Sequence, residues 1–113
     1  METDQLSVIV AKEFSMTPGP RYRSEGDFSG QQFREELLRP RFIKALETNK
    51  KLFVDLDGTE GYLTSFLEEA FGGLAREFGE DVVESRLQFK SLDDPLAVEE
   101  ILEYIKDAGK PRM

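Results

Sequence analysis

The side chains available for chemistry are carboxylates, hydroxyls, lysines and arginines, because the 113-residue chain has no cysteine and no histidine. Their absence excludes thiol nucleophiles, disulfide bonds, histidine general bases and the commonest zinc sites. Three groups of polar residues have a spacing that could form a site: two aspartates after an apolar run, an arginine-bearing loop, and a serine beside glutamates at a helix start. Each group also has an ordinary structural role, in a turn, an ion pair or a helix cap.

Asp55 and Asp57 belong to the run Phe53-Val-Asp-Leu-Asp-Gly-Thr59. This run resembles the nucleophile motif of the haloacid-dehalogenase-like phosphatases. The resemblance implies that Asp55 attacks phosphorus, that Asp57 acts as general acid and base, and that both help to hold magnesium. Lys90 and the pair Asp93–Asp94 would match the lysine and the second acidic pair of that family.

Three features of the sequence weigh against a phosphatase. The motif would follow the second strand rather than the first, too few residues follow Thr59 to complete that fold, and Glu60 stands where the family has an apolar residue. A strand that ends in an Asp-Gly turn explains the same residues. We therefore predict a protein that is not an enzyme and has no cofactor. A magnesium-dependent phosphatase using Asp55 and Asp57 is the alternative, and a non-catalytic binder of a small ligand or nucleotide is another.

The loop over residues 16–30 is rich in proline and glycine and is followed by the start of a helix. Arginines beside the free amides of a helix start can hold an anion or an acidic partner. The residues that would do so are Arg21, Arg23, Ser29, Gly30 and Arg34. We favour an internal use, in which the arginines pair with carboxylates of the same chain, such as Asp55 or Asp57, and pin the loop.

Ser65 precedes Glu68 by three residues, which is the pattern of a capping box at the start of a helix. Glu68 and Glu69 then fall in the first turn, where carboxylates are stabilised by the helix dipole. The same position could accept a phosphate on Ser65 or on the neighbouring Thr64, because free amides and the dipole favour an anion there. The two glutamates could also contact a basic partner.

The elements that must position these residues alternate between strands and helices. Short apolar runs predict strands, and apolar residues at three- and four-residue spacing predict helices. The predicted strands are 6–14, 51–56 and 85–90, and the predicted helices are 30–48, 65–78 and one beginning at 94. This order favours an α/β fold with a small mixed, largely parallel sheet flanked by helices. Loops 15–30, 57–64 and 91–94 would then share the carboxyl edge of the sheet, where we expect any site.

Three segments of the sequence resemble the STAS-like domain family of unknown function. They are Thr17–Arg23, Ser29–Leu38 and the long run Phe53–Leu74, which contains Ser-Phe-Leu-Glu-Glu-Ala-Phe-Gly-Gly. The resemblance covers residues 14–78 and implies a STAS-like fold and a relation to bacterial anti-sigma-factor antagonists. Those proteins bind a kinase-like ATPase and are switched by phosphorylation of a serine at the start of a helix.

The position that matches the phosphorylated serine of that superfamily is Ser65, with Thr64 beside it. The superfamily carries Asp-Ser-Ser-Gly-Leu or a close variant there, whereas this chain has Leu63 in place of the acid and Phe66 in place of the glycine. The resemblance therefore implies a regulatory or protein-interaction domain, with partner switching through the helix start at Ser65 as one way of working.

The formal net charge of −8 argues against a protein that binds nucleic acid or an anionic membrane. All of the excess lies in residues 51–113, which hold fifteen acidic and seven basic side chains, whereas residues 1–50 are neutral. No run is long and apolar enough to span a membrane, and the polar N-terminus is unlike a signal peptide. We expect a cytoplasmic protein with one domain over 1–108 and a flexible tail over 109–113. An exposed edge strand would allow a homodimer.

Overall fold

The computed structural model describes residues 6–108, so the predicted tail over 109–113 lies outside the described residues. Its centre is a three-stranded sheet in the order β1-β2-β3. The strands are β1 (Leu6–Ile9), β2 (Leu52–Asp55) and β3 (Leu87–Lys90). Both pairs of neighbours are parallel, with Leu52 opposite Leu6 on one side and Leu87 on the other. The predicted α/β fold is confirmed, and the three strands are parallel throughout.

Two long helical segments each contain a π-helical turn. The first segment consists of α2 (Gly30–Phe33), η2 (Arg34–Leu38) and α3 (Arg39–Glu47), and the second of α4 (Thr64–Leu67), η3 (Glu68–Gly72) and α5 (Gly73–Phe78). Pro40 has no N–H to donate, which accounts for the irregular hydrogen bonding just before it. The first segment is continuous through Pro40, as one of the two interpretations of residues 30–48 expects.

One predicted strand is shorter in the structure than expected, and three short helical elements were not predicted. The strand predicted over 6–14 ends at Ile9, because the chain turns into the short helix α1 (Val10–Glu13). The loop predicted over 16–30 contains a 3-10 turn, η1 (Arg23–Glu25). Helix α6 (Glu80–Arg86) was not predicted, because only Val83 is buried in it and its apolar pattern is weak.

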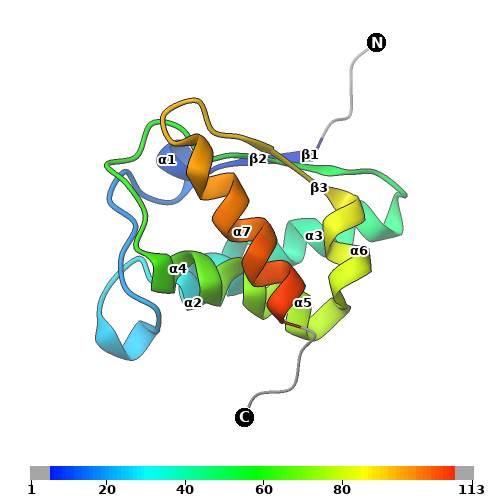
Figure 1. Cartoon of the computed structure of the whole chain (residues 1–113), viewed down its shortest axis with the longest axis horizontal. Helices are drawn as coiled ribbons and strands as arrows, with labels where there is room; N and C mark the ends of the chain where they lie inside the picture. The colour runs from blue at the N-terminus through cyan, green and yellow to red at the C-terminus, as the bar shows by residue number, and fades with distance from the viewer. Residues whose placement is uncertain (1–5, 109–113) are drawn as a thin grey trace.

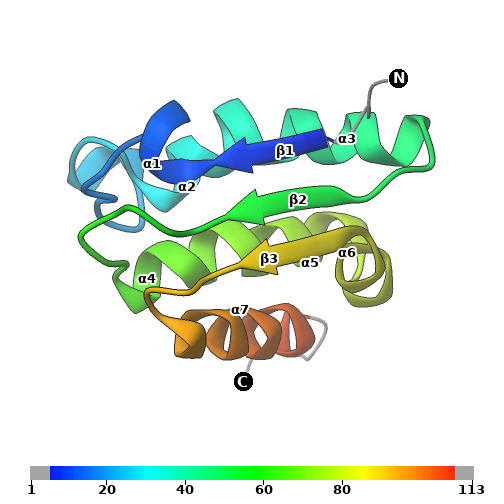
Figure 2. The same ribbon diagram turned by 90° about the horizontal axis from the view of Figure 1, so that it is seen from above.

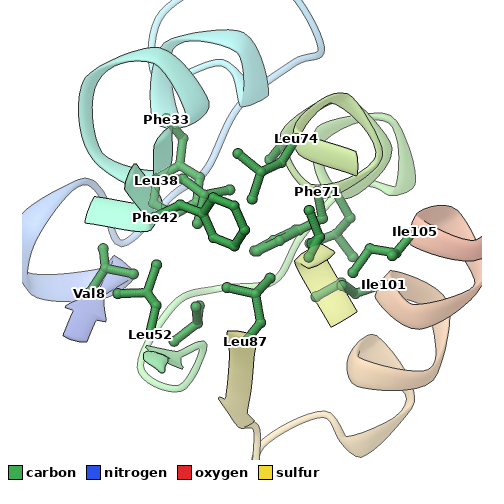
Figure 3. Packing of buried hydrophobic residues seen from close by; sticks show 14 of the residues in the cluster. Val8, Phe33, Leu38, Phe42, Leu52, Phe71, Leu74, Leu87, Ile101 and Ile105 are labelled. Atoms are coloured by element: carbon green, nitrogen blue, oxygen red, sulfur yellow. The ribbon is translucent and has the colours of Figure 1, made fainter. Parts of the chain in front are cut away.

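The helices pack on one face of the sheet. Figures 1 and 2 show α3, α5 and the last helix, α7 (Pro95–Asp107), beneath the three strands, with α6 at the end where β3 begins. Alternate strand residues face this layer and are buried, among them Val8, Leu52 and Val54. Figure 3 shows the strand leucines and Val8 meeting large side chains from the helices. These helical core residues include Phe33, Leu38, Phe42, Phe71, Leu74, Ile101 and Ile105.

The outer edge of β1 is closed by two side chains of the same chain. Arg41 Nη1 donates to the carbonyl of Ser7 at 3.0 Å, and Glu13 Oε2 accepts from the N–H of Ile9 at 2.9 Å. Arg41 and Glu13 also form an ion pair at 2.5 Å. Both backbone groups are therefore satisfied internally and are not free to pair with the strand of another chain. Within residues 6–108 no helix is both long and apolar enough to cross a membrane.

Candidate functional site

The loops after β2 and β3 leave the sheet at the same edge, because the two strands are parallel. The loop that follows α1 joins them, since the N–H of Glu60 donates to the carbonyl of Met16 at 2.8 Å. A hollow of about 250 Å³ lies between the loops. It is lined by Leu56, Thr59, Glu60, Gly61, Tyr62, Ser91, Asp93 and Asp94. Two of the three predicted loops thus line a hollow at the predicted edge.

The aspartates at this edge hold the loops together. Asp57 Oδ1 accepts from the N–H of Asp93 at 2.8 Å, and Asp93 Oδ2 accepts from the N–H of Gly58 at 3.0 Å. The backbone N–H of Asp93 is also the main reason that the pKa of Asp57 is lower than usual. Asp55 Oδ1 accepts from the N–H of Asp57 at 3.0 Å. Both carboxylates of the predicted motif, Asp55 and Asp57, therefore accept hydrogen bonds from backbone N–H groups of the turns.

The residues of the phosphatase alternative do come together at one edge. Lys90 Nζ lies 3.9 Å from Asp55 Oδ2, and Asp93 is bonded to Asp57 as described above. Asp94 is exposed and precedes α7 without a side-chain capping bond. Over residues 6–108, however, no cluster of three or more acidic side chains is placed to hold a metal ion.

Tyr62 anchors the loop between β2 and α4. Its hydroxyl donates to the carbonyl of Leu56 at 2.8 Å, and its ring packs against Phe66 with a centroid distance of 5.8 Å. Burial, with the nearby carboxylate of Asp55 as a smaller cause, raises the pKa of Tyr62. The hydroxyl therefore stays protonated and keeps the loop against the end of the helix layer.

The loop arginines pair internally, as expected, but their partners are glutamates at the start of the second long helix. Arg21 Nη1 donates to Glu68 Oε1, and Arg76 Nη1 donates to Glu68 Oε2 at 2.6 Å. Arg34 Nη2 donates to Glu69 Oε2 at 2.6 Å, and its Nε donates to the Glu69 carbonyl at 3.2 Å. We name Arg21, Arg34, Glu68, Glu69 and Arg76 the crossing network. The internal pairing uses Glu68 and Glu69, not Asp55 or Asp57.

The glutamates of the crossing network are partly shielded from water, whereas Arg76 is exposed. Glu69 is 7% exposed, and its carboxylate is compensated by the Arg34 guanidinium. Burial opposes ionisation of Glu68, but hydrogen bonds from Arg76 and Arg21 outweigh it, so the pKa of Glu68 is lowered. The network joins the two π-helical turns, since Arg34 belongs to η2 and the glutamates to η3. Such turns recur at functional sites, and this pair was not visible in the sequence.

Two glycines let the long helices approach closely. A Cβ at Gly30 would lie 2.5 Å from the carbonyl oxygen of Phe66, and a Cβ at Gly73 would lie 2.6 Å from Arg34 Nε. Either contact is shorter than atoms in proteins tolerate. Gly30 therefore sets the crossing of the helices and Gly73 makes room for Arg34. These positions belong to the segments that carry the family resemblance.

The remaining loop residues are also used within the fold. Ser29 is fully buried, and its hydroxyl accepts from the N–H of Gln32 at 3.0 Å, as the capping pattern predicts. Arg23 pairs with Glu35 at 2.9 Å and with Glu36 at 3.3 Å on the surface. An external anion would therefore have to displace existing partners of the arginines and could not reach Ser29.

Ser65 does not cap its helix. Helix α4 begins one residue earlier, at Thr64, and the capping position is held by Leu63 without a side-chain bond. Glu68, the other half of the expected capping box, is bound to Arg21 and Arg76. The expectation fails because Leu63 already has the extended backbone of a capping residue. Thr64 is exposed and Ser65 is half-buried.

Sequence reasoning missed two residues at this site, Arg76 and Tyr104. Arg76 lies eight residues after Glu68, which is about two helical turns, so the spacing was a usable signal. Tyr104 of α7 shares a side-chain hydrogen bond with Thr64. That contact links elements distant in the chain, and no local pattern indicates it.

One of three comparisons with known proteins found a match. The family described as a STAS-like domain of unknown function (DUF4325) matches residues 29–97, which is more than half of the chain. The matched range contains Ser29, Gly30 and all of the crossing network except Arg21. Comparison with curated proteins and with solved structures found no significant match. This chain belongs to the family of STAS-like domains of unknown function.

Proposed function

We propose that this protein is a regulatory protein-interaction domain that binds its partner through a surface at the start of α4. The surface, named here the α4 start, consists of Leu63, Thr64 and Ser65. The observation that carries the proposal is the exposure of Leu63, which is 56% exposed, directly before a helix whose next apolar residues are fully packed. A partner that covers Leu63 would remove this apolar surface from water, which favours binding.

The surroundings of the α4 start support a rigid recognition surface. Tyr62 fixes the chain just before it, and Glu68 fixes the helix one turn later through Arg21 and Arg76. A surface that is already ordered loses little conformational entropy on binding, which favours affinity.

Phosphorylation of Thr64 or Ser65 is the proposed means of regulation. A phosphate adds close to two negative charges and several strong acceptor atoms. Placed beside Glu68, it would compete for Arg21 and Arg76 and would change the charge of the contact surface. Thr64 is the more accessible acceptor because it is exposed, whereas Ser65 is half-buried. The partner suggested by the wider superfamily is a kinase-like ATPase.

The proposal is tested by capture of partners from lysate of the native host. Wild type, Ser65→Glu, Ser65→Ala and Leu63→Ser serve as baits, and Ser24→Glu adds the same charge to an exposed serine elsewhere. We expect one ATPase to be retained by wild type, Ser65→Ala and Ser24→Glu and lost with Ser65→Glu and Leu63→Ser. Equal retention by all five baits would overturn the role of the α4 start.

Phosphatase activity is the competing proposal, because Asp55, Asp57 and Lys90 do share one edge of the sheet. It predicts magnesium-dependent hydrolysis of phosphoesters that is lost in Asp55→Asn and kept in Asp27→Asn. We expect no hydrolysis by either variant or by wild type, since the Asp57 and Asp93 carboxylates are bonded to loop amides.

A further inference from the structure

The outer face of α7 carries two hollows on either side of a ridge of glutamates. One hollow, of about 380 Å³, is lined by Leu96, Glu99, Glu100, Glu103 and Tyr104. The other, of about 290 Å³, is lined by Glu84, Glu99, Leu102, Glu103 and Lys106. Glu99 and Glu103 line both hollows and form the ridge between them. We name this surface the α7 face.

The negative charge of the α7 face is not neutralised within the described chain. Within residues 6–108, no ion pair shorter than 4 Å joins a basic side chain to Glu84, Glu99, Glu100 or Glu103. Lys106 is the basic side chain among the residues that line the two hollows. Burial, and after it the charge of Glu100, raises the pKa of Tyr104. Part of the excess of acidic over basic side chains in residues 51–113 therefore lies on the α7 face.

Large apolar side chains are exposed on and beside the α7 face. Leu96 is 63% exposed at the start of α7, and Leu92, in the loop before it, is 77% exposed. Leu102 lines the second hollow and is also exposed. Apolar side chains in hollows next to unpaired acids are complementary to a ligand with the opposite charge and its own apolar side chains.

We propose that the α7 face binds a cationic amphipathic helix of a partner protein. Leucine, isoleucine or phenylalanine side chains of that helix occupy the two hollows, and its lysines and arginines lie over Glu99, Glu100 and Glu103. A helix that presents apolar residues every three or four positions fits such a surface. Nucleic acid and anionic membranes are repelled by the same glutamates. The inference rests on the proposed interaction function but uses a surface other than the α4 start.

The probe is a peptide of about 18 residues with leucines at helical three- and four-residue spacing and lysines elsewhere. A scrambled peptide of the same composition and a version with glutamate in place of lysine are the controls. Fluorescence anisotropy measures the dissociation constant at two salt concentrations. We expect the cationic amphipathic peptide to bind more tightly than both controls and to weaken as salt rises. Equal affinity for the scrambled peptide, or no binding up to about 1 mM, overturns the proposal.

Matched variants locate the binding surface. Glu99→Gln/Glu103→Gln is compared with Asp27→Asn/Glu47→Gln, which also removes two exposed negative charges but on other parts of the chain. Leu96→Ser is compared with Met16→Ser, because both side chains are well exposed. We expect at least a fivefold loss of affinity for each variant in the α7 face and less than a twofold change for each control. Equal losses in variant and control would mean non-specific attraction to an acidic protein and would overturn the inference.

Amide shift mapping separates this inference from the proposed function. We expect the peptide to shift the amides of residues 92–106 in wild type. Peptide binding at those amides, with equal lysate capture by all five baits, keeps the α7 face and overturns the α4 start. Shifts confined to residues 17–36 overturn the α7 face and leave the α4 start to be decided by the capture experiment.

Discussion

The crossing network and the α7 face are both rich in glutamate, but the glutamates differ in burial and in ion pairing. In the crossing network, Glu68 and Glu69 are largely buried and are compensated by three arginines. On the α7 face, Glu99, Glu100 and Glu103 are exposed and, within residues 6–108, form no ion pair within 4 Å. Glutamates that cannot be told apart in the sequence are therefore buried and paired in one region and, among the described residues, exposed without an ion pair in the other.

The difference shows which charges belong to the fold and which are available to a partner. Burying an ionised carboxylate is costly unless a cation and hydrogen bonds compensate it, so the arginines of the crossing network are needed for folding. Exposed glutamates cost little and leave a negative potential outside the molecule. The predictions below test this contrast by changing one region at a time.

Glu69→Gln should have the largest effect on stability. The substitution keeps the shape of the side chain but leaves the partly buried Arg34 guanidinium without its counter-charge. Removing one partner of a buried pair costs about 3 kcal/mol of unfolding free energy. Urea unfolding followed by circular dichroism measures the loss. A change as small as that of the exposed-surface variant Glu47→Gln would contradict the role of the crossing network.

Gly30→Ala should be the next most destabilising change. The added methyl group meets the backbone oxygen of Phe66 and forces the two long helices apart. Overpacking of this kind costs about 1–3 kcal/mol, and only part is offset by the better helix propensity of alanine. Gly61→Ala is not an adequate control because Gly61 has a φ of 134°. Thr48→Ala, at an exposed helix end, is the control and should lose less unfolding free energy than Gly30→Ala when both are measured by urea unfolding.

Acidification should destabilise the protein in the range where its paired carboxyls become protonated. The pKa of Glu68 is lowered from 4.5 by its arginines despite its burial, so the folded state binds protons less readily than the unfolded state. The stabilisation is complete well above pH 4.5 and is lost as the pH falls through the lower folded value. Glu68→Gln should flatten the pH dependence of the unfolding free energy below neutrality, whereas Glu47→Gln should leave its shape unchanged.

Neutralising the ridge of the α7 face should have the smallest effect on stability. Glu99→Gln/Glu103→Gln removes two exposed charges and keeps the helix propensity, so the unfolding free energy should change by less than about 0.5 kcal/mol. Thermal unfolding checks this at two salt concentrations. A loss as large as that of Glu69→Gln would show that the ridge belongs to the fold.

The sequence was sufficient for those parts of the fold that rest on local patterns. The strands around Val54 and Phe89, the helix ending at Phe78 and the Ser29 cap all have local signals of periodicity or hydrogen-bonding pattern. Helix α6 has only a weak apolar face and was missed. The strand predicted over 6–14 was too long because an apolar run has no intrinsic end, and the turn into α1 depends on tertiary packing.

The candidate site was harder to predict because its residues are joined across long distances in the chain. Internal pairing of the loop arginines was predicted from the sequence, but the partner of Arg21 lies 47 residues away, and aspartates were expected in place of Glu68. The cap expected at Ser65 lies two residues after the observed capping position, Leu63. No local sequence pattern distinguishes the paired glutamates from those on α7, because ion pairing depends on where the arginines lie in the fold.

The most direct test of the contrast measures unfolding free energy and peptide affinity on the same two variants, Glu69→Gln and Glu99→Gln/Glu103→Gln. A domain that starts with a stability of about 5–15 kcal/mol stays mostly folded after the first substitution, so both properties can be measured. We predict that Glu69→Gln loses about 3 kcal/mol and keeps its affinity for the cationic peptide within twofold. We predict that the ridge variant keeps its stability and loses at least fivefold in affinity. Parallel losses of stability and affinity in both variants would contradict the division between charges of the fold and charges of the binding surface.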